Sequence, residues 1–597
     1  MFIIPRPREL TELEGRIPAY AFRIRCEENE IAGYAADFVK AGQNEEAAEI
    51  APTDIIFTKK AEYEKEHYSI SAKNGRIEVS YGTLESAYRA VSTLRQVIDQ
   101  AEDGTISEFE IDDYPSIPNR GLMLDISRGK QPKMSELKQM IDNMAAVKYN
   151  QLQLYIDTFV FEFPNFKEYS EEMEPYTAKD LAEIEAYCAE RFIRLVPTIN
   201  GFGHMAAWTF KDEFSHLAIH DENGKPTHTL NPFKEESLAL IDQIYDGYLD
   251  LFKSDLVNIG MDEPFDLGKG ETKEACEKYG VGKVYTDYLN KVCALATKKY
   301  SKTPMFWSDI VFDHEEQLPN IPKNAIVMDW GYETEQHFDR NCRKLSELGL
   351  RYYVCPGTSM WCSFTGRSNN AMLNIMEAAE CGEYYGAEGF LLTEWGDGGN
   401  PQFLNLSYLP IVFGAAMSWN YGSHRTATAY AERTKTMAMC KQYLDRYIYH
   451  TKKGDLADIV FRMGNYYLLE EHLKHNITLL TMYLWNPEKL TKGAAKGFAR
   501  VADYMKDIRA ELADVKADEL CLREIKQSCD TVILFAETLS GEIKEESLIR
   551  LQAVREEFEE LWQIRNKKPG MEIYGKMLSD TEAYIRRSLE GRAEKEK

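Results

Sequence analysis

Short apolar runs alternate with amphipathic stretches between residues 116 and 422, and this alternation constrains the fold more than any other feature. The runs are typical of buried parallel strands, and the amphipathic stretches are typical of the helices that cover them. Eight runs can be counted: Gly121–Asp125, Gln151–Ile156, Leu195–Ile199, Leu256–Gly260, Met305–Trp307, Ile326–Trp330, Tyr352–Cys355 and Gly389–Leu392. The stretches between them include Met134–Val147, Ala178–Arg191, Glu235–Phe252 and Tyr285–Lys299.

Eight strands with intervening helices predict an α/β fold of the TIM (β/α)8 barrel type. An open, doubly wound sheet would use the same elements, but no glycine-rich phosphate-binding sequence follows the first strand. We therefore predict a barrel domain over residues 116–422.

The segments on either side of the barrel differ from it and from each other. Residues 1–115 combine β-like runs with one helical pattern over Leu84–Val97, which predicts a small α+β domain ending near the prolines of Tyr114–Pro118. Residues 423–597 contain long charged amphipathic patterns, such as Ala495–Ala510 and Ser547–Asn566, and predict an α-helical domain. Such a bundle packs either on the barrel or on a partner subunit, and the second arrangement would make a homodimer.

Composition narrows the class of function. The formal charge of −26 disfavours binding to nucleic acid or to an anionic membrane surface. No apolar stretch approaches the ~18 residues of a spanning helix, and the first residues do not resemble a secretory signal. The 11 cysteines are scattered without a CxxC pair, as expected for reduced thiols. We expect a cytoplasmic protein.

Polar and aromatic side chains stand just past the predicted strands, where a TIM barrel places its active site. Acidic residues and tryptophans in one pocket are typical of carbohydrate binding, because indole faces stack on sugar C–H groups while carboxylates bind hydroxyls. The residues are Asp157, His204, Asp262, Glu263, Trp307, Trp330, Trp395 and Asp397.

The adjacent pair Asp262-Glu263 is the most specific of these features. Neighbouring residues in a strand point to opposite faces, so both carboxylates reach one pocket only if the strand ends there, which Pro264 favours. Two carboxylates close together raise the pKa of one of them, which produces an acid that works near neutral pH.

Several motifs in order resemble glycoside hydrolase family 20, the exo-acting β-N-acetylhexosaminidases. They are the run from Arg120 to Arg128, Gly203-His204, Asp262-Glu263 and the tryptophans Trp307, Trp330 and Trp395. The resemblance covers roughly residues 1–420 and implies the substrate-assisted retaining mechanism, in which the 2-acetamido oxygen of the sugar attacks its own anomeric carbon. It implies a small oligosaccharide or glycoconjugate as substrate, with no cofactor and no metal.

The resemblance also implies roles for single residues. Glu263 would be the general acid and base, and Asp262 would orient the acetamido nitrogen. Asp157 and His204 would form a hydrogen-bonded pair that supports the acid. The sugar-binding residues would be Arg120 at O3 and O4, Asp397 at O4 and O6, and Trp307, Trp330 and Trp395 around the acetamido methyl and the sugar face.

The chain departs from the family pattern after the seventh strand. The usual Tyr-Leu-Asp is absent, and residues 356–361 read Pro-Gly-Thr-Ser-Met-Trp. The tyrosine that binds the acetamido oxygen is therefore unassigned, with Tyr332 as a candidate from another loop. The changed loop carries Trp361 and Arg367, and it could reshape the pocket for a galacto-configured or modified sugar.

Other interpretations remain open at this point. A retaining β-glycosidase of the two-carboxylate type would use Glu394 or Asp397 as its nucleophile. A sugar-binding protein without turnover would have no need of both Asp262 and Glu263. A metal-dependent hydrolase could use His216, His220 and His228, although their spacing matches no compact zinc motif.

Overall fold

The central domain is a closed ring of parallel strands. In the computed structural model, which describes residues 1–36, 52–170, 173–424 and 429–595, their order is β12-β13-β14-β15-β16-β7-β8-β9. The bounds are β7 Asn119–Asp125, β8 Gln151–Tyr155, β9 Arg194–Pro197, β12 Leu256–Asn258, β13 Thr303–Trp307, β14 Ile326–Trp330, β15 Arg351–Cys355 and β16 Gly389–Glu394. The end of β9 returns to β12, where the Ile199 N–H donates to the Asn258 carbonyl at 2.9 Å. The predicted barrel is confirmed, and its strand carboxyl ends share one face.

Helices cover the outside of the barrel. They are α4 Met134–Ala146, α5 Ala178–Ala189, α8 Glu235–Tyr245, α10 Val281–Lys298, α12 Phe338–Glu347, α13 Ser368–Tyr385 and α14 Leu404–Asn420. The pattern over Glu235–Phe252 predicted a longer helix than α8, which ends early because Gly247 adopts a φ of +73°. Side chains such as Met123, Met305 and Met328 fill the barrel interior.

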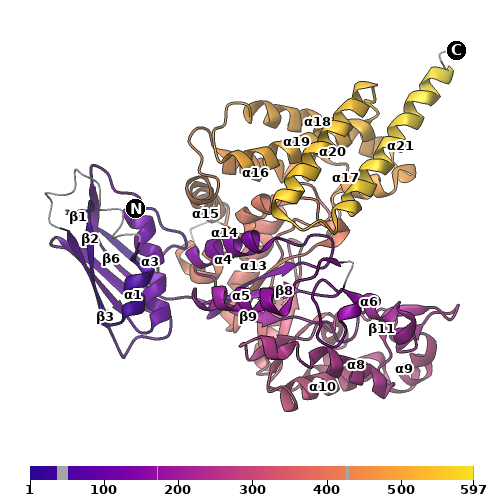
Figure 1. Cartoon of the computed structure of the whole chain (residues 1–597), viewed down its shortest axis with the longest axis horizontal. Helices are drawn as coiled ribbons and strands as arrows, with labels where there is room; N and C mark the ends of the chain where they lie inside the picture. The colour runs from indigo at the N-terminus through magenta and orange to yellow at the C-terminus, as the bar shows by residue number, and fades with distance from the viewer. Residues whose placement is uncertain (37–51, 171–172, 425–428, 596–597) are drawn as a thin grey trace.

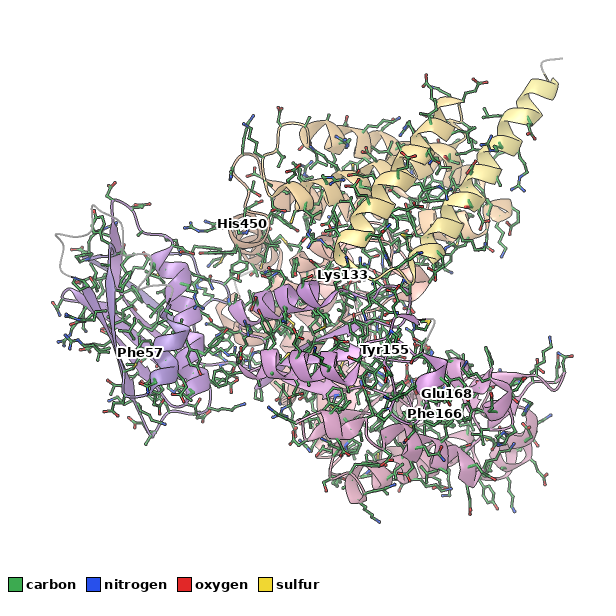
Figure 2. All side chains as sticks on the ribbon, viewed as in Figure 1. Phe57, Lys133, Tyr155, Phe166, Glu168 and His450 are labelled. Carbon is green, nitrogen blue, oxygen red and sulfur yellow. The ribbon has the colours of Figure 1, made fainter. Side chains whose placement is uncertain are left out.

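The N-terminal domain is a six-stranded sheet in the order β1-β6-β4-β5-β3-β2. Its strands are β1 Glu9–Pro18, β2 Phe22–Arg25, β3 Thr53–Lys59, β4 Tyr68–Lys73, β5 Arg76–Tyr81 and β6 Thr105–Asp113. Helices α1 Asn29–Tyr34 and α3 Leu84–Ile98 lie on the side of the sheet that faces the barrel (Figure 1). Phe57 packs in the separate hydrophobic core of this domain (Figure 2).

Helices form the C-terminal domain: α15 Ala429–Tyr443, α16 Leu456–Met463, α17 Leu479–Trp485, α18 Lys492–Glu511, α19 Glu519–Ser540, α20 Glu546–Arg565 and α21 Met571–Lys595. They pack on the barrel and share its hydrophobic core, with the rings of Phe403 and Phe558 5.8 Å apart. Lys133 lies at this junction (Figure 2), and its N–H donates to the Arg565 carbonyl. Among the described residues, no helix combines the length and apolarity needed to cross a membrane.

Candidate active site

The backbone just past β12 brings both carboxylates of the acidic pair into one cavity. β12 ends at Asn258, and the chain then takes left-handed conformations at Gly260 (φ +67°), Met261 (φ +76°) and Glu263 (φ +49°). Non-glycine residues adopt such conformations at a cost, and they cluster at functional sites. The Asn200 side chain stabilises this turn, since its oxygen accepts the Met261 N–H at 3.2 Å. The strand therefore ends before the pair, as the sequence predicted.

His204 bridges the two carboxylates. Its Nε2 lies 3.1 Å from Glu263 Oε2 and 3.3 Å from Asp262 Oδ2. The backbone at residue 203 passes close to the backbone at Asp262, and only glycine fits there, because a Cβ at this position would lie 2.1 Å from the Asp262 carbonyl oxygen. Asp262 is almost buried and also accepts a hydrogen bond from the Asn200 amide at 2.8 Å, whereas the Glu263 side chain is about one third exposed to the cavity.

These contacts set the charges of the site. Burial disfavours a charged imidazole, but the neighbouring carboxylates of Asp262 and Glu263 outweigh it and raise the pKa of His204 to about 10. Burial likewise opposes ionisation of Asp262, yet its charge interaction and hydrogen bond with His204 lower its pKa. Because Asp262 and Glu263 are adjacent, we expected the pKa of one of these two carboxyl groups to be raised. The structure instead makes Asp262 a stable buried anion, because a histidine lies between the two groups.

A different carboxyl group carries the raised pKa. Asp309, at the end of β13, accepts the Glu263 N–H at 2.9 Å. Burial and the nearby charge of Asp262 raise the pKa of Asp309 to about 8. This group is therefore neutral at pH 7 and ionises at mildly alkaline pH.

Arg128, not Arg120, lies at the cavity. The Arg128 guanidinium donates to Asp397 at 2.9 Å and to Asp157 at 3.2 Å, and it lies over the Trp395 ring. Arg120 is 1% exposed at the opposite end of β7, where it donates to Glu66 at 2.6 Å. The predicted role of Arg120 in sugar binding is therefore wrong: this residue lies at the amino end of β7 and faces the N-terminal domain, away from the strand carboxyl ends.

Asp157 also departs from its predicted arrangement. Its carboxylate binds Arg128 instead of pairing directly with His204, and Arg128 Nη2 lies 3.5 Å from His204 Nδ1. Arg128 thus stands between the two residues, and its charge opposes protonation of His204. Asp157 positions the arginine and does not line the cavity.

Aromatic side chains form the walls of a cavity of about 420 Å³ at the strand carboxyl ends. The predicted residues Trp307, Trp330, Tyr332, Trp361, Trp395 and Asp397 all line it, together with Arg128, His204, Asp262 and Glu263. The Trp395 indole N–H donates to the Tyr332 hydroxyl at 2.8 Å. Among the described residues, the buried indole N–H groups of Trp307 and Trp330 have no hydrogen-bond acceptor. Buried donors of this kind are costly, so they suit a ligand that supplies acceptors.

Besides Arg128, which was named in the family motif without a role, four lining residues were missed by the sequence prediction: Cys362, His475, Asn476 and Ile477. Cys362 follows Trp361 in the changed loop after β15. The other three come from the helical domain, where a polar loop carries no local signal of a site in the barrel.

The residues of the alternative mechanisms, a protein nucleophile and a metal-binding histidine cluster, lie as follows. Glu394 is buried, accepts a hydrogen bond from Ser407 at 2.8 Å and does not line the cavity, which removes it as a candidate nucleophile. His220 pairs with Glu271 at 2.7 Å and His228 with Asp266 at 3.3 Å, so these histidines do not form a metal site together. The donor atoms of His204, Asp262 and Glu263 lie within 4.8 Å of one another, and this cluster has the spacing that a metal ion could use.

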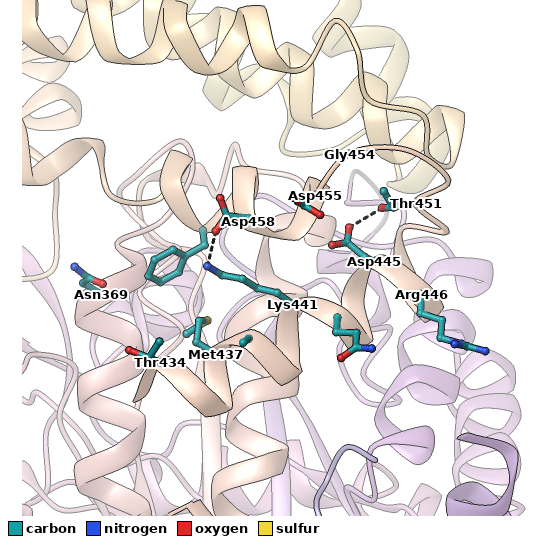
Figure 3. Close-up of a pocket in the computed structure, with 13 residues that line it drawn as sticks. Asn369, Thr434, Met437, Lys441, Asp445, Arg446, Thr451, Gly454, Asp455 and Asp458 are labelled. Atoms are coloured by element: carbon teal, nitrogen blue, oxygen red, sulfur yellow. Dashed lines mark hydrogen bonds and ion pairs between the residues drawn. The ribbon is translucent and has the colours of Figure 1, made fainter. Parts of the chain in front are cut away.

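A larger cavity of about 790 Å³ lies in the helical domain, between α15 and α16 (Figure 3). Two of its acidic side chains are engaged by neighbours in the lining: Lys441 binds Asp458 at 2.7 Å, and Asp445 accepts from Thr451 at 2.6 Å. It shares no lining residue with the cavity at the strand carboxyl ends, which holds Asp262 and Glu263, so we place the active site in that smaller cavity.

Comparison with known proteins identifies related sequences. A model of the glycosyl hydrolase family 20 catalytic domain matches residues 118–388, and a model of domain 2 of that family matches residues 1–114. Human hexosaminidase D is 26% identical over 291 residues, which cover 45% of this chain and 58% of that protein. The β-hexosaminidase subunit beta of Entamoeba histolytica is 25% identical over 291 residues, covering 44% and 50%. The chain thus spans little more than half the length of these curated relatives.

Solved structures share the fold. The chitobiase of Flavobacterium johnsoniae superposes with a TM-score of 0.60 at 18% identity, covering 98% of this chain and 99% of that one. A Streptomyces plicatus β-hexosaminidase mutant in complex with the product GlcNAc gives a TM-score of 0.55 at 19% identity, covering 74% and 94%.

Proposed function

The chain belongs to glycosyl hydrolase family 20, and from this membership and the geometry of its cavity we propose that it is an exo-acting β-N-acetylhexosaminidase. It would release terminal β-linked N-acetylglucosamine or N-acetylgalactosamine from oligosaccharides or glycoconjugates. One observation carries the proposal: Asp262 and Glu263 meet in a tryptophan-walled cavity at the barrel mouth, with His204 bonded to both.

The arrangement suits substrate-assisted catalysis. Glu263, the more exposed carboxyl group, would protonate the glycosidic oxygen as the C1–O bond breaks and the acetamido oxygen attacks C1. The oxazolinium ring so formed carries positive charge on its nitrogen, and the buried carboxylate of Asp262 is suited to stabilise it. Glu263 would then accept a proton from the water that opens the ring, which retains the configuration at C1.

The size of the cavity supports exo action. A volume of about 420 Å³ holds a single acetamido sugar, and aromatic side chains from several strand ends line it. A polymer chain cannot pass through such a pocket, so the substrate would enter by its non-reducing end.

Hydrolysis of paired 4-nitrophenyl β-glycosides tests the proposal. We expect cleavage of the acetamido sugars but not of the plain glucoside and galactoside, with inhibition by a thiazoline analogue of the intermediate. Glu263→Gln should lower kcat by ~10²–10⁴, most strongly for poor leaving groups, because general acid catalysis is lost. Asp262→Asn should also cripple turnover. Unchanged activity in both variants would refute the site assignment.

A protein nucleophile is the competing outcome. Asp397 lines the cavity and would be the candidate in the two-carboxylate mechanism. A 2-fluoro sugar would then trap a glycosyl ester on Asp397, detectable by mass spectrometry, whereas the substrate-assisted enzyme forms no such ester.

We also propose that the enzyme acts in the cytoplasm on short oligosaccharides. All 11 cysteines are unpaired, as is usual for proteins of reducing compartments. Fractionation of the native cells with an antibody would test this location.

A further inference from the structure

A loop of the helical domain reaches the cavity. It runs from Glu470 to Thr478, between a short turn over Tyr466–Leu469 and helix α17. Its residues His475, Asn476 and Ile477 line the cavity, although more than 80 residues separate them from the last barrel strand. The substrate pocket is therefore built by two domains.

Buried charged groups hold this loop against the barrel. Arg367, 2% exposed, makes a bidentate pair with Glu333, both contacts measuring 2.8 Å. Glu333 Oε1 also accepts the Asn476 N–H at 2.6 Å, and the Cys362 carbonyl accepts the Thr478 N–H at 3.2 Å. A bidentate arginine–carboxylate pair is rigid and directional, so the loop position is fixed by the segments that follow β14 and β15. Asn476 has a φ of +59°, a conformation that asparagine tolerates.

The loop adds polar side chains where the barrel supplies few. On the wall formed after β14 and β15, the lining residues of the barrel are Trp330, Tyr332, Trp361 and Cys362. The charged lining residues Arg128, His204, Asp262, Glu263 and Asp397 come from other strand ends. Hydroxyl groups of a sugar that face the aromatic wall need donors and acceptors, and His475 and Asn476 offer both.

The position of the acid indicates which sugar atoms meet this wall. Glu263 must lie beside the glycosidic oxygen, which directs C1 toward β12. In the ring order, β16 is opposite β12, and β15 is its neighbour. C4 lies across a pyranose ring from C1, so the C4 side of the sugar points toward β15 and β16, where both the loop and Asp397, which follows β16, line the cavity.

We propose that His475 and Asn476 bind the C4 edge of the terminal sugar and determine the preference between its gluco and galacto epimers. This inference rests on the proposed function. The epimers differ in the orientation of the C4 hydroxyl group alone, so groups fixed at that edge bind one epimer better.

The test compares kcat/KM for the 4-nitrophenyl β-glycosides of N-acetylglucosamine and N-acetylgalactosamine. His475→Ala should lower kcat/KM for the preferred epimer by about 3–10-fold, equivalent to one hydrogen bond of ~0.5–1.5 kcal/mol, with a smaller effect on the other epimer. Asn476→Gly removes the amide but keeps the positive φ accessible, and it should shift the epimer ratio in the same way. His472→Ala is the matched control, because His472 is exposed in the same loop and does not line the cavity.

The outcomes separate the two proposals. An equal loss for both epimers, or an unchanged ratio in both variants, would overturn the role of the loop in specificity. A shift in the control as large as that in His475→Ala would do the same. Failure of the unmodified enzyme to cleave either acetamido sugar would instead refute the proposed function, and that result is visible before any variant is made.

Discussion

Two arginines at opposite ends of β7 have separable roles, and substitution of each by methionine tests this. Arg120 donates to Glu66 and to the carbonyls of Ile117, Pro118 and Lys148, in a buried position between the N-terminal domain and the barrel. Removing one member of a buried ion pair costs about 3–5 kcal/mol when the remaining charge loses its partner, and the lower end of this range applies here because Glu66 keeps Arg89 at 3.2 Å. We expect Arg120→Met to lower the stability by this amount and to leave kcat/KM nearly unchanged.

Arg128→Met should give the opposite result. The Arg128 guanidinium holds Asp397 and Asp157 and lines the cavity. Loss of two charge-assisted hydrogen bonds, at ~1.5–3 kcal/mol each, corresponds to a fall in kcat/KM of roughly 10²–10⁴.

The assay is hydrolysis of a 4-nitrophenyl acetamido glycoside, with urea unfolding followed by tryptophan fluorescence on the same samples. A large loss of kcat/KM in a stable Arg120→Met protein, with full activity in Arg128→Met, would refute the assignment. Arg343→Met is a control for loss of an exposed arginine, since the Arg343 side chain is 54% exposed and pairs with Asp339 within helix α12.

Two further predictions concern pH. The pKa of His204 rises from 6.5 to about 10, so its charge stabilises the folded state fully below pH 6.5 and this contribution is lost as the pH rises through 10. The stability difference between the unmodified protein and His204→Gln should therefore shrink between pH 7 and pH 10 in urea titrations, and a constant difference would contradict the raised pKa. The pKa of Asp309 rises from 3.8 to about 8, so keeping this group buried costs stability increasingly from pH 4 to pH 8. Asp309→Asn should gain stability relative to the unmodified protein over that range, measured by the midpoint of thermal unfolding, and a parallel pH dependence of the two proteins would argue against it.

The barrel was predictable because its strands are buried on both faces and read as continuous apolar runs. Strand β1 is harder to predict, because it lies at the sheet edge and alternates exposed glutamates with few buried residues. The acidic pair and the tryptophans of the site could be predicted, because they directly follow predicted strands, and the carboxyl ends of barrel strands meet at one face. The sugar-binding role was assigned to Arg120 and not to Arg128 because the motif contains both arginines and does not show which of them lies at the carboxyl end of the strand, where the substrate binds.

The remaining site residues could not be found in the sequence. His475 and Asn476 lie in a polar loop, and only the packing of the helical domain brings them to the barrel mouth. The charge of His204 likewise depends on three groups that meet in space. Long-range packing of this kind leaves no periodic pattern along the chain.

The common hydrophobic core of the barrel and the helical domain has a consequence for unfolding. Domains with separate cores can open one at a time, whereas elements that bury the same side chains lose their order together. The barrel and the helices would therefore act as one cooperative unit, and the N-terminal sheet, with a core of its own, as a second. A local opening of the helical domain would withdraw His475 from the pocket and loosen the barrel in the same event, so pocket integrity and global stability are linked in this chain.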